Sequence, residues 1–181
     1  MKDNELSKFL SYVLRHNPES IGIVMDYNGW VKVDDLINSI NLSKSDVITF
    51  DKLVNIVETS SKQRFSFNED KTLIRANQGH SIDVDVQLGK SLPPDELFHG
   101  TVSKYTKSIE KEGLVAKNRL YVHLSKDLQT AIEVGRRHGT PVVYKVNCKQ
   151  MLIDGYEFYL SKNNVWLIKS VPSKYLSLVA L

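Results

Sequence analysis

The sequence has only one cysteine and no long apolar run. The lone thiol, Cys148, cannot form an internal disulfide bond, and its position in VVYKVNCKQM predicts a small core residue at the end of a buried strand rather than a nucleophile. No stretch approaches the roughly 20 apolar residues that cross a bilayer, and MKDNELSKFL lacks the apolar core of a signal peptide. We therefore expect a cytoplasmic protein with no membrane partner.

Common catalytic motifs are also missing. The sequence contains no GxxxxGK[ST], GxGxxG, HExxH or CxxC pattern, so P-loop, Rossmann and structural zinc folds have no support. The five histidines are His16, His80, His99, His123 and His138. They are too dispersed along the chain to predict a metal site, and we expect no metal cofactor.

Charge is distributed unevenly along a chain of ordinary globular composition, with 41% hydrophobic and 25% charged residues. The net charge is +3, but residues 1–90 carry 11 Lys and Arg against 13 Asp and Glu, whereas residues 91–181 carry 13 against 8. The net charges of the two halves are therefore −2 and +5. The second half attracts anions, which permits a polyanionic substrate without requiring one.

The N-terminal segment has the apolar spacing of an amphipathic helix, with Asp3 or Asn4 available as its N-cap. Proline disfavours helical geometry in the residue before it, so the helix ends ahead of Pro18. Arg15 and His16 therefore fall in the last turn, where the helix dipole stabilises a cation. This position explains the pair without requiring a function.

The rest of the first half predicts a winged helix. A short strand at 29–33 precedes a short helix that Asp34 caps and that runs through Ile40. Ser43 or Ser45 caps a longer helix to about residue 60. Strand patterns at 64–67 and 72–76 flank turn residues, which indicates a hairpin. Three helices followed by a hairpin describe a winged helix, which often binds nucleic acid and sometimes only protein.

The polar, Gly- and Pro-containing residues 79–94 are interpreted as a link between lobes. The second half then predicts a mixed α+β lobe with short strands. Helices are expected up to Gly113 and over 127–137, with strands at 120–124, 141–146, 156–160 and 165–168.

Arginines and histidines stand beside glycines at several points: Leu14-Arg15-His16, Gln78-Gly79-His80-Ser81, His99-Gly100-Thr101 and Gly135-Arg136-Arg137-His138. The planar fork of arginine matches phosphate oxygens, and glycine lets a ligand approach the main chain. Each instance also has a purely structural explanation, as a helix end or a turn. Together they suit a phosphate-rich substrate.

In order along the chain, these segments resemble the RNA 2′-phosphotransferase family, whose eukaryotic members complete tRNA splicing. The matching stretches cover nearly the whole chain: LSKFLSYVLRHNP, GWVKVDDLI, KQRFSF, LIRANQGHS, LFHGT, RLYVHLS, VGRRHG and NNVWLIKSVPSKYL. Several long motifs in the correct order are more specific than any short pattern. Tyr121 departs from the pattern, since some relatives have a second histidine there.

The resemblance implies an α+β protein with a winged-helix RNA-binding lobe at residues 1–90 and an ADP-ribosyltransferase-like, NAD-binding lobe at residues 95–181. It carries the family's catalytic set onto Arg15, His16, Arg64 and Arg119. It carries the nucleotide-binding elements onto His99, Gly100, Thr101, His123, Ser125 and Arg136, the last near the NAD⁺ pyrophosphate. The implied partners are NAD⁺, consumed as a co-substrate, and a tRNA-like RNA that bears a 2′-phosphate. We expect a monomer.

The chemistry implied by the resemblance has two steps. The 2′-phosphate, already an anionic nucleophile, attacks the ribose carbon that bears nicotinamide, giving RNA whose 2′-phosphate carries ADP-ribose. A ribose hydroxyl then attacks the phosphorus and releases 2′-OH RNA and ADP-ribose 1″,2″-cyclic phosphate. Arg15, Arg64 and Arg119 would hold the phosphate and neutralise charge. His16 would give a proton to the departing RNA oxygen, since histidine is the side chain that ordinarily titrates near neutral pH.

Two alternatives stay open. A non-catalytic winged-helix module with an accessory α+β domain would turn over no NAD⁺, and it leaves the arginine and histidine motifs unexplained. A transferase that stops after the first step would move ADP-ribose to nucleic-acid ends or to protein, with no need for Arg15, His16 or Arg64 in the N-terminal lobe. No glutamate occupies an evident catalytic motif, which argues against protein-modifying transferases that rely on one.

Overall fold

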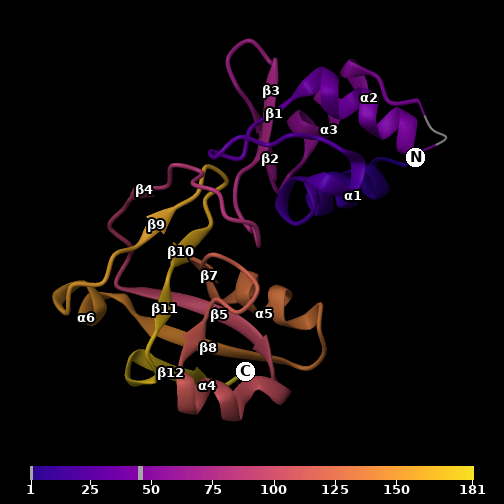
Figure 1. The fold of residues 1–181 in the computed structure, drawn as a ribbon. Coiled ribbons are helices and arrows are strands. Elements are labelled where there is room, and N and C mark those ends of the chain that lie inside the picture. Colours follow the sequence, from indigo (N-terminus) through magenta and orange to yellow (C-terminus); the bar gives the residue numbers. More distant parts are fainter. Residues whose placement is uncertain (1, 45–46) are drawn as a thin grey trace. The chain divides into compact units, whose positions relative to one another are not determined.

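The computed structural model describes residues 2–44 and 47–181. The chain divides into two compact units, residues 1–87 and 88–181, here called the N-terminal unit and the C-terminal unit (Figure 1). Both combine helices with antiparallel strands, which agrees with the predicted α+β class. The division falls inside the segment 79–94 that was interpreted as a link, and residues 79–87 belong to the N-terminal unit.

The N-terminal unit contains the predicted helices and hairpin in the predicted order. Among the described residues, α1, α2 and α3 cover Asp3–Arg15, Val33–Ser43 and Phe50–Thr59, and the 3-10 helix η1 covers Pro18–Ile21. Strands β1, β2 and β3 cover Val31–Lys32, Phe65–Phe67 and Leu73–Ala76. They form an antiparallel sheet in the order β1-β3-β2, in which β2 and β3 are the hairpin.

The predicted helix caps were wrong. Lys2 rather than Asp3 or Asn4 is the N-cap of α1, and its backbone N–H donates to the Glu5 carboxylate at 3.1 Å. α2 begins at Val33 after Lys32, so Asp34 lies in its first turn, where an acidic side chain complements the helix dipole. Ser43 ends α2 and Ser45 lies outside the described residues; α3 is capped by the Thr49 hydroxyl, which accepts from the Lys52 N–H.

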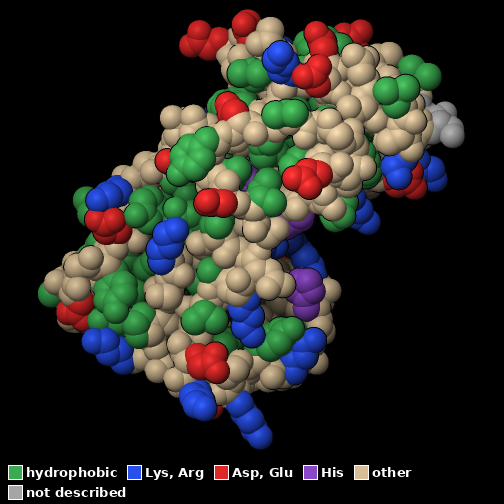
Figure 2. Space-filling view, viewed as in Figure 1, with side chains coloured by type: hydrophobic (Ala, Val, Ile, Leu, Met, Phe, Trp, Pro, Cys, Tyr) green, Lys and Arg blue, Asp and Glu red, His purple; other side chains and the backbone are tan. Residues whose placement is uncertain are grey.

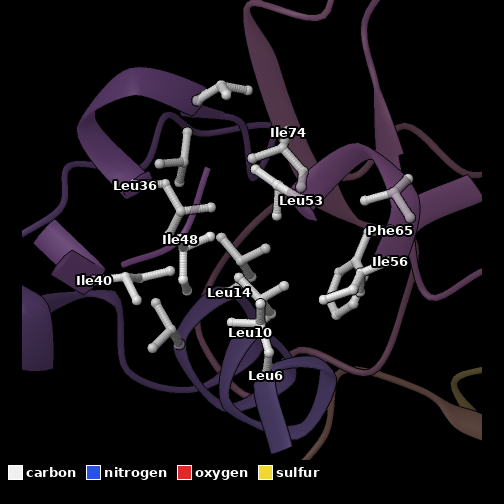
Figure 3. Packing of buried hydrophobic residues seen from close by; sticks show 14 of the residues in the cluster. Leu6, Leu10, Leu14, Leu36, Ile40, Ile48, Leu53, Ile56, Phe65 and Ile74 are labelled. Atoms are coloured by element: carbon white, nitrogen blue, oxygen red, sulfur yellow. The ribbon is translucent and has the colours of Figure 1, made fainter. Parts of the chain in front are cut away.

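The core of the N-terminal unit is built where the apolar faces of its helices meet the sheet. Figure 3 shows side chains from the three helices pointing toward one another and toward strands β2 and β3. Burying each such side chain contributes about 1.5–3 kcal/mol. The fully or nearly fully buried members labelled there are Leu6, Leu10, Leu14, Leu36, Ile40, Ile48, Leu53, Ile56, Phe65 and Ile74.

The C-terminal unit contains two larger antiparallel sheets with short helices. One sheet has the order β12-β8-β5, from Leu176–Val179, Pro141–Asn147 and Glu96–Val102. The other has the order β4-β9-β10-β7, from Gly89–Lys90, Tyr159–Leu160, Trp166–Ile168 and Val122–Leu124. Strands β6 (Leu114–Val115) and β11 (Ser170–Val171) pair separately, and the helices are η2 (Ser103–Tyr105), α4 (Thr106–Glu112), α5 (Leu128–Arg136), α6 (Cys148–Ile153) and η3 (Ser173–Tyr175).

Helix α5 packs very closely against strand β5, and two glycines make this possible. A Cβ at Gly100 would lie 1.7 Å from the Ala131 carbonyl oxygen, and one at Gly135 would lie 2.6 Å from the Thr101 carbonyl oxygen. Both distances are far below any real Cβ contact, so each position excludes a side chain. The glycines of the HGT and GRRH segments therefore admit a neighbouring backbone, where the sequence had suggested the approach of a ligand.

Cys148 is a core residue, as predicted, but it starts a helix instead of ending a strand. β8 stops at Asn147, whose side chain caps α6 by accepting from the Gln150 N–H at 3.0 Å. The thiol is fully buried and contacts the Val146 carbonyl oxygen at 3.6 Å. Burial raises the pKa of Cys148 to about 12, so the thiolate that a nucleophile needs is not formed near neutral pH.

Candidate functional site

The C-terminal end of α1 carries the first pair of predicted site residues. Arg15 is the last residue of the helix and His16 is its C-cap, as the position of Pro18 predicted. The His16 backbone N–H still bonds the Tyr12 carbonyl at 3.0 Å, so the turn is held in place up to the histidine. A cationic side chain at this end also complements the helix dipole.

The segment Gly79–Ser81 folds back onto this helix end. The Ser81 backbone N–H donates to the Arg15 carbonyl oxygen at 3.0 Å, and the Ser81 Oγ lies 2.9 Å from the His16 Nδ1. Gly79 has a left-handed φ of 90°, and a Cβ placed there would lie 3.5 Å from both Cδ and Nη1 of Arg15. One tripeptide thus fixes the main chain of Arg15, the ring of His16 and the space beside the guanidinium.

His80, at the centre of this tripeptide, is buried with 2% of its surface exposed. Burial, followed by the positive charge of Arg15, His16 and Arg75, lowers the pKa of His80 to about 4. Its Nε2 has no hydrogen-bond partner among the described residues. His80 is therefore a buried, neutral ring that stands between the two residues contacting Arg15 and His16. The sequence alone assigned it no role, although the Gln78-Gly79-His80-Ser81 segment was singled out.

Arg64 also lies against α1, but at a different point. It precedes β2, and its Nη1 approaches the Ser7 hydroxyl at 3.5 Å, a long contact. Ser7 precedes Arg15 by eight residues, which corresponds to roughly 12 Å along the helix axis. The structure thus places Arg64 beside the same helix as Arg15 and His16, at Ser7 in the first half of that helix.

In the C-terminal unit, the structure brings together three of the predicted residues through two hydrogen bonds. The Arg119 Nη1 lies 2.9 Å from the His123 Nδ1, and the His99 Nδ1 lies 2.9 Å from the His123 carbonyl oxygen. A guanidinium only donates, so the His123 Nδ1 accepts and its proton resides on Nε2. A carbonyl only accepts, so the His99 Nδ1 donates and its Nε2 is left as an acceptor when the ring is neutral.

Burial shifts the pKa values of two residues in this cluster, His99 and Arg119. It lowers the pKa of His99, an effect that the bond to the His123 carbonyl partly opposes, so the neutral ring is favoured. Desolvation also lowers the pKa of Arg119, which nevertheless stays a cation because arginine titrates far above neutral pH. A cation that is partly shielded from water interacts strongly with an incoming anion.

Strand geometry places two further predicted residues near His99. Thr101 is two residues beyond it on β5, so both side chains share one face of the strand. Ser125 follows β7 and is joined to Phe98 by a pair of backbone hydrogen bonds of 2.9 and 2.7 Å. Arg136 is different: it lies exposed at the end of α5, where the helix dipole also favours a cation.

Among the described residues, no three or more His, Cys, Asp or Glu side chains are arranged to hold a metal ion. In residues 2–44 and 47–181, no helix combines the length and apolar character needed to cross a membrane.

Comparison with known proteins assigns the family. Residues 1–170 match the sequence model of the RNA 2′-phosphotransferase, Tpt1 / KptA family. The chain is 50% identical over 171 residues to a protein of Flavobacterium johnsoniae named "Probable RNA 2′-phosphotransferase", covering 94% of this chain and 93% of the relative. Proteins with the same name in Nostoc punctiforme and Hahella chejuensis are 52% and 48% identical, over 95% and 96% of this chain and 94% and 92% of their own lengths. The resemblance seen in the motifs is confirmed, and the chain belongs to the RNA 2′-phosphotransferase family.

Proposed function

We propose that this protein removes an internal 2′-phosphate from RNA by transferring it to NAD⁺, through an ADP-ribosylated 2′-phospho-RNA intermediate. The products would be 2′-OH RNA, nicotinamide and ADP-ribose 1″,2″-cyclic phosphate. The observation that carries this proposal is that the family match spans residues 1–170 and so includes the basic clusters of both units. The N-terminal unit would then act as a winged helix that binds RNA, and the C-terminal unit as an ADP-ribosyltransferase-like fold that binds NAD⁺.

The side chains of the C-terminal cluster fit a dinucleotide. A neutral His99 offers an acceptor at Nε2, and Thr101 and Ser125 offer hydroxyl groups, which suits ribose hydroxyls. Gly100 would contribute through its main chain. It has no side chain to offer, and the close packing of α5 leaves no space for one. Arg136 would pair with the pyrophosphate from the end of α5.

In the first step, we propose that Arg119 orients a phosphate oxygen for attack on the ribose carbon as the bond to nicotinamide breaks. His123 holds the guanidinium through the 2.9 Å bond at Nδ1, which leaves the other guanidinium N–H groups for the phosphate. Nicotinamide leaves as a neutral molecule with the bonding electrons. No general base is needed, since the nucleophile is already an anion.

In the second step, a ribose hydroxyl attacks the phosphorus and loses its proton to solvent, and the bond to the RNA 2′-oxygen breaks. Arg15 and Arg64 would neutralise the charge that develops on the phosphorus oxygens. His16 would protonate the departing oxygen, with its ring oriented by the Ser81 hydroxyl. The neutral His80 adds no further positive charge near neutral pH.

The test is incubation of the protein with an RNA that bears one internal 2′-phosphate, with and without NAD⁺ and with a metal chelator present. We expect the 2′-phosphate to be lost and nicotinamide to be released only when NAD⁺ is added, because NAD⁺ is the proposed acceptor. The chelator should have no effect, since the proposed phosphate clamp is built from arginines. Binding of RNA without any turnover would favour the non-catalytic module. ADP-ribosylated RNA as the final product would favour the one-step transferase. Activity that disappears in chelator and returns only with a divalent ion would refute the metal-free mechanism.

A further inference from the structure

The two units carry net charges of opposite sign. Residues 1–87 have 10 Lys and Arg against 13 Asp and Glu, a net charge of −3, whereas residues 88–181 have 14 against 8, a net charge of +6. Phosphate contacts with Lys and Arg supply most of the sequence-independent affinity for nucleic acid. The helix-and-hairpin unit is therefore the less favourable of the two for the RNA backbone, and the C-terminal unit is the more favourable.

Within the C-terminal unit, basic side chains are concentrated around α4. Residues 103–119 carry five basic residues against Glu110 and Glu112, a net charge of +3 that equals the net charge of the entire chain. Figure 2 shows Lys and Arg side chains gathered over the part of the molecule where Figure 1 places α4. The basic residues are Lys104, Lys107, Lys111, Lys117 and Arg119.

An exposed aromatic ring lies among these cations. Tyr105 is 42% exposed, and its ring centroid lies 4.9 Å from the Lys104 Nζ and 5.1 Å from the Lys117 Nζ. We call Lys104, Tyr105 and Lys117 the Tyr105 patch. Proteins that bind single-stranded nucleic acid combine these same two elements, an aromatic face for a base and cations for the backbone. The lysine side chains are long and exposed, so they can move to phosphates when a base stacks on the ring.

A tight turn connects this patch to the proposed catalytic site. The Arg119 N–H donates to the Ala116 carbonyl oxygen at 2.7 Å, and Lys117 adopts a left-handed φ of 34° within the turn. Such a φ is uncommon for lysine. Consecutive Cα atoms are about 3.8 Å apart, so the Cα atoms of Lys117 and Arg119 lie within about 7.6 Å of each other. A phosphate held at Arg119 therefore has its neighbouring nucleotides within reach of Lys117.

We propose that the Tyr105 patch binds the single-stranded RNA that flanks the 2′-phosphate, with the lysines on backbone phosphates and Tyr105 stacked on a base. The inference rests on the proposed function, which makes RNA the substrate. It adds a contact with the RNA backbone on the C-terminal unit to the RNA contacts proposed for the N-terminal unit.

The test compares two double variants of the full-length protein that remove the same charge from the same unit. One is Lys104→Gln with Lys117→Gln; the matched control is Lys149→Gln with Lys162→Gln, two exposed lysines of α6 and the loop after β9. Binding of a fluorescent single-stranded RNA without a 2′-phosphate is measured by anisotropy over a range of salt concentrations. We expect the patch variant to lose affinity and its salt dependence to fall by about 1.4 in log K against log salt. The control should bind like the wild type.

Tyr105 provides a second arm of the test. Tyr105→Ala should weaken RNA binding on the order of 5- to 100-fold, the range of one lost stacking contact, while Tyr105→Phe keeps the ring and should bind normally. Inorganic polyphosphate, which has no bases, should bind equally well to Tyr105→Ala and to the wild type. If the alanine variant lost polyphosphate binding as well, the ring would be acting on the fold rather than on a base, and stacking would be refuted.

The binding assay separates this inference from the proposed function, because it needs neither NAD⁺ nor turnover. A selective loss in the patch variant supports the inference even if no 2′-phosphate is ever removed. Equal loss in both double variants, or no loss in either, overturns it even if turnover is observed. A protein that binds anionic lipid vesicles as tightly as RNA, with the same dependence on the patch, would also overturn it.

Discussion

The N-terminal and C-terminal units hold their proposed catalytic residues by different means. In the N-terminal unit, a loop segment, Gly79–Ser81, fixes a helix end through one backbone bond and one side-chain bond. In the C-terminal unit, neighbouring strands carry His99 and His123, and Arg119 is attached to them by a single bond. A site on strands is positioned by many ladder bonds, whereas a site on a loop depends on a few contacts. The N-terminal cluster should therefore be the more sensitive to single substitutions that touch no substrate.

The largest expected effect is on the rate of the second chemical step, which should depend more on the N-terminal unit than the first step does. His16→Ala or Arg64→Ala should slow the second step on the order of 100- to 1,000-fold, because that transition state puts charge on the phosphorus oxygens and the departing RNA oxygen. The first step should be slowed less, so RNA bearing ADP-ribose on its 2′-phosphate should accumulate. Gel separation of substrate, intermediate and product over time measures both rates.

Arg119→Ala is the comparison for that experiment, and it should slow the first step as well. Equal slowing of both steps in His16→Ala and Arg64→Ala, with no intermediate at any time, would mean that these residues do not act selectively on the second transfer.

The next effect is on stability and concerns only the C-terminal unit. Gly100→Ala forces a Cβ to within 1.7 Å of the Ala131 carbonyl oxygen and should destabilise that unit by more than about 3 kcal/mol. Gly89→Ala is the control, because nothing lies within 4 Å of its added Cβ. Each unit contains one tryptophan, Trp30 or Trp166, so urea unfolding of Gly100→Ala in a Trp30→Phe background reports on the C-terminal unit alone.

If Gly100→Ala unfolds at the same urea concentration as Gly89→Ala, the close packing of α5 on β5 is wrong. A side chain would then be tolerated at Gly100.

A smaller effect is the pH dependence of the N-terminal unit. The pKa of His80 is lowered from 6.5 to about 4, so the unfolded chain takes up a proton first as pH falls below 6.5. Stability from the neutral ring is complete above about pH 6.5 and is lost progressively toward pH 4. At pH 5 the loss is about 2 kcal/mol relative to pH 7.

Urea unfolding followed by Trp30 in a Trp166→Phe background measures this loss at pH 7 and pH 5. His80→Gln should abolish most of the difference between the two pH values, since it removes the titrating group, while His138→Gln on an exposed position should leave it unchanged. A His80→Gln protein with an undiminished pH dependence would show that His80 is not the buried neutral group.

The smallest effect tests the contact between the Gly79–Ser81 segment and His16. Ser81→Ala removes a hydrogen bond worth about 0.5–1.5 kcal/mol, so kcat should fall roughly 2- to 10-fold with little change in KM for RNA. Ser81→Thr keeps a hydroxyl and should restore most of the rate. Ser11→Ala is the control, because the Ser11 hydroxyl bonds only within α1, to the Ser7 carbonyl.

Nitrogen NMR shifts of the His16 ring give a readout that is independent of turnover. They should change in Ser81→Ala and not in Ser11→Ala; identical spectra in both would mean that the Ser81 hydroxyl does not orient the ring.

Sequence patterns predicted the longer helices and the hairpin well, but they predicted contacts between distant segments poorly. Helical spacing located α1, α3 and α5, and alternation located the β2–β3 hairpin, because these patterns depend only on neighbours along the chain. The pairs β4–β9 and β6–β11 were missed, since two-residue strands leave no periodicity to detect. α6 was missed for a related reason: its short apolar pattern continues directly from β8.

The candidate site shows the same contrast between local patterns and contacts of distant segments. Arg15 and His16 could be placed at a helix end from Pro18 alone. The polar composition of residues 79–94 favoured a link, yet Gly79, His80 and Ser81 pack against that helix end, a contact across more than 60 residues that composition does not encode. At Gly100 the sequence suggested a ligand close to the main chain; the structure shows the backbone of α5 close to this glycine, and the ligand contact stays a prediction.

The proposed transfer of the 2′-phosphate to NAD⁺ is tested most directly by following the phosphorus atom itself. RNA carrying a radiolabelled internal 2′-phosphate is incubated with the protein and NAD⁺, and all labelled products are separated. We expect the label to pass first to an RNA species that also contains ADP-ribose and then entirely to ADP-ribose 1″,2″-cyclic phosphate, with none released as inorganic phosphate. Label that appears as inorganic phosphate, or that leaves the RNA equally fast without NAD⁺, would contradict the transfer mechanism.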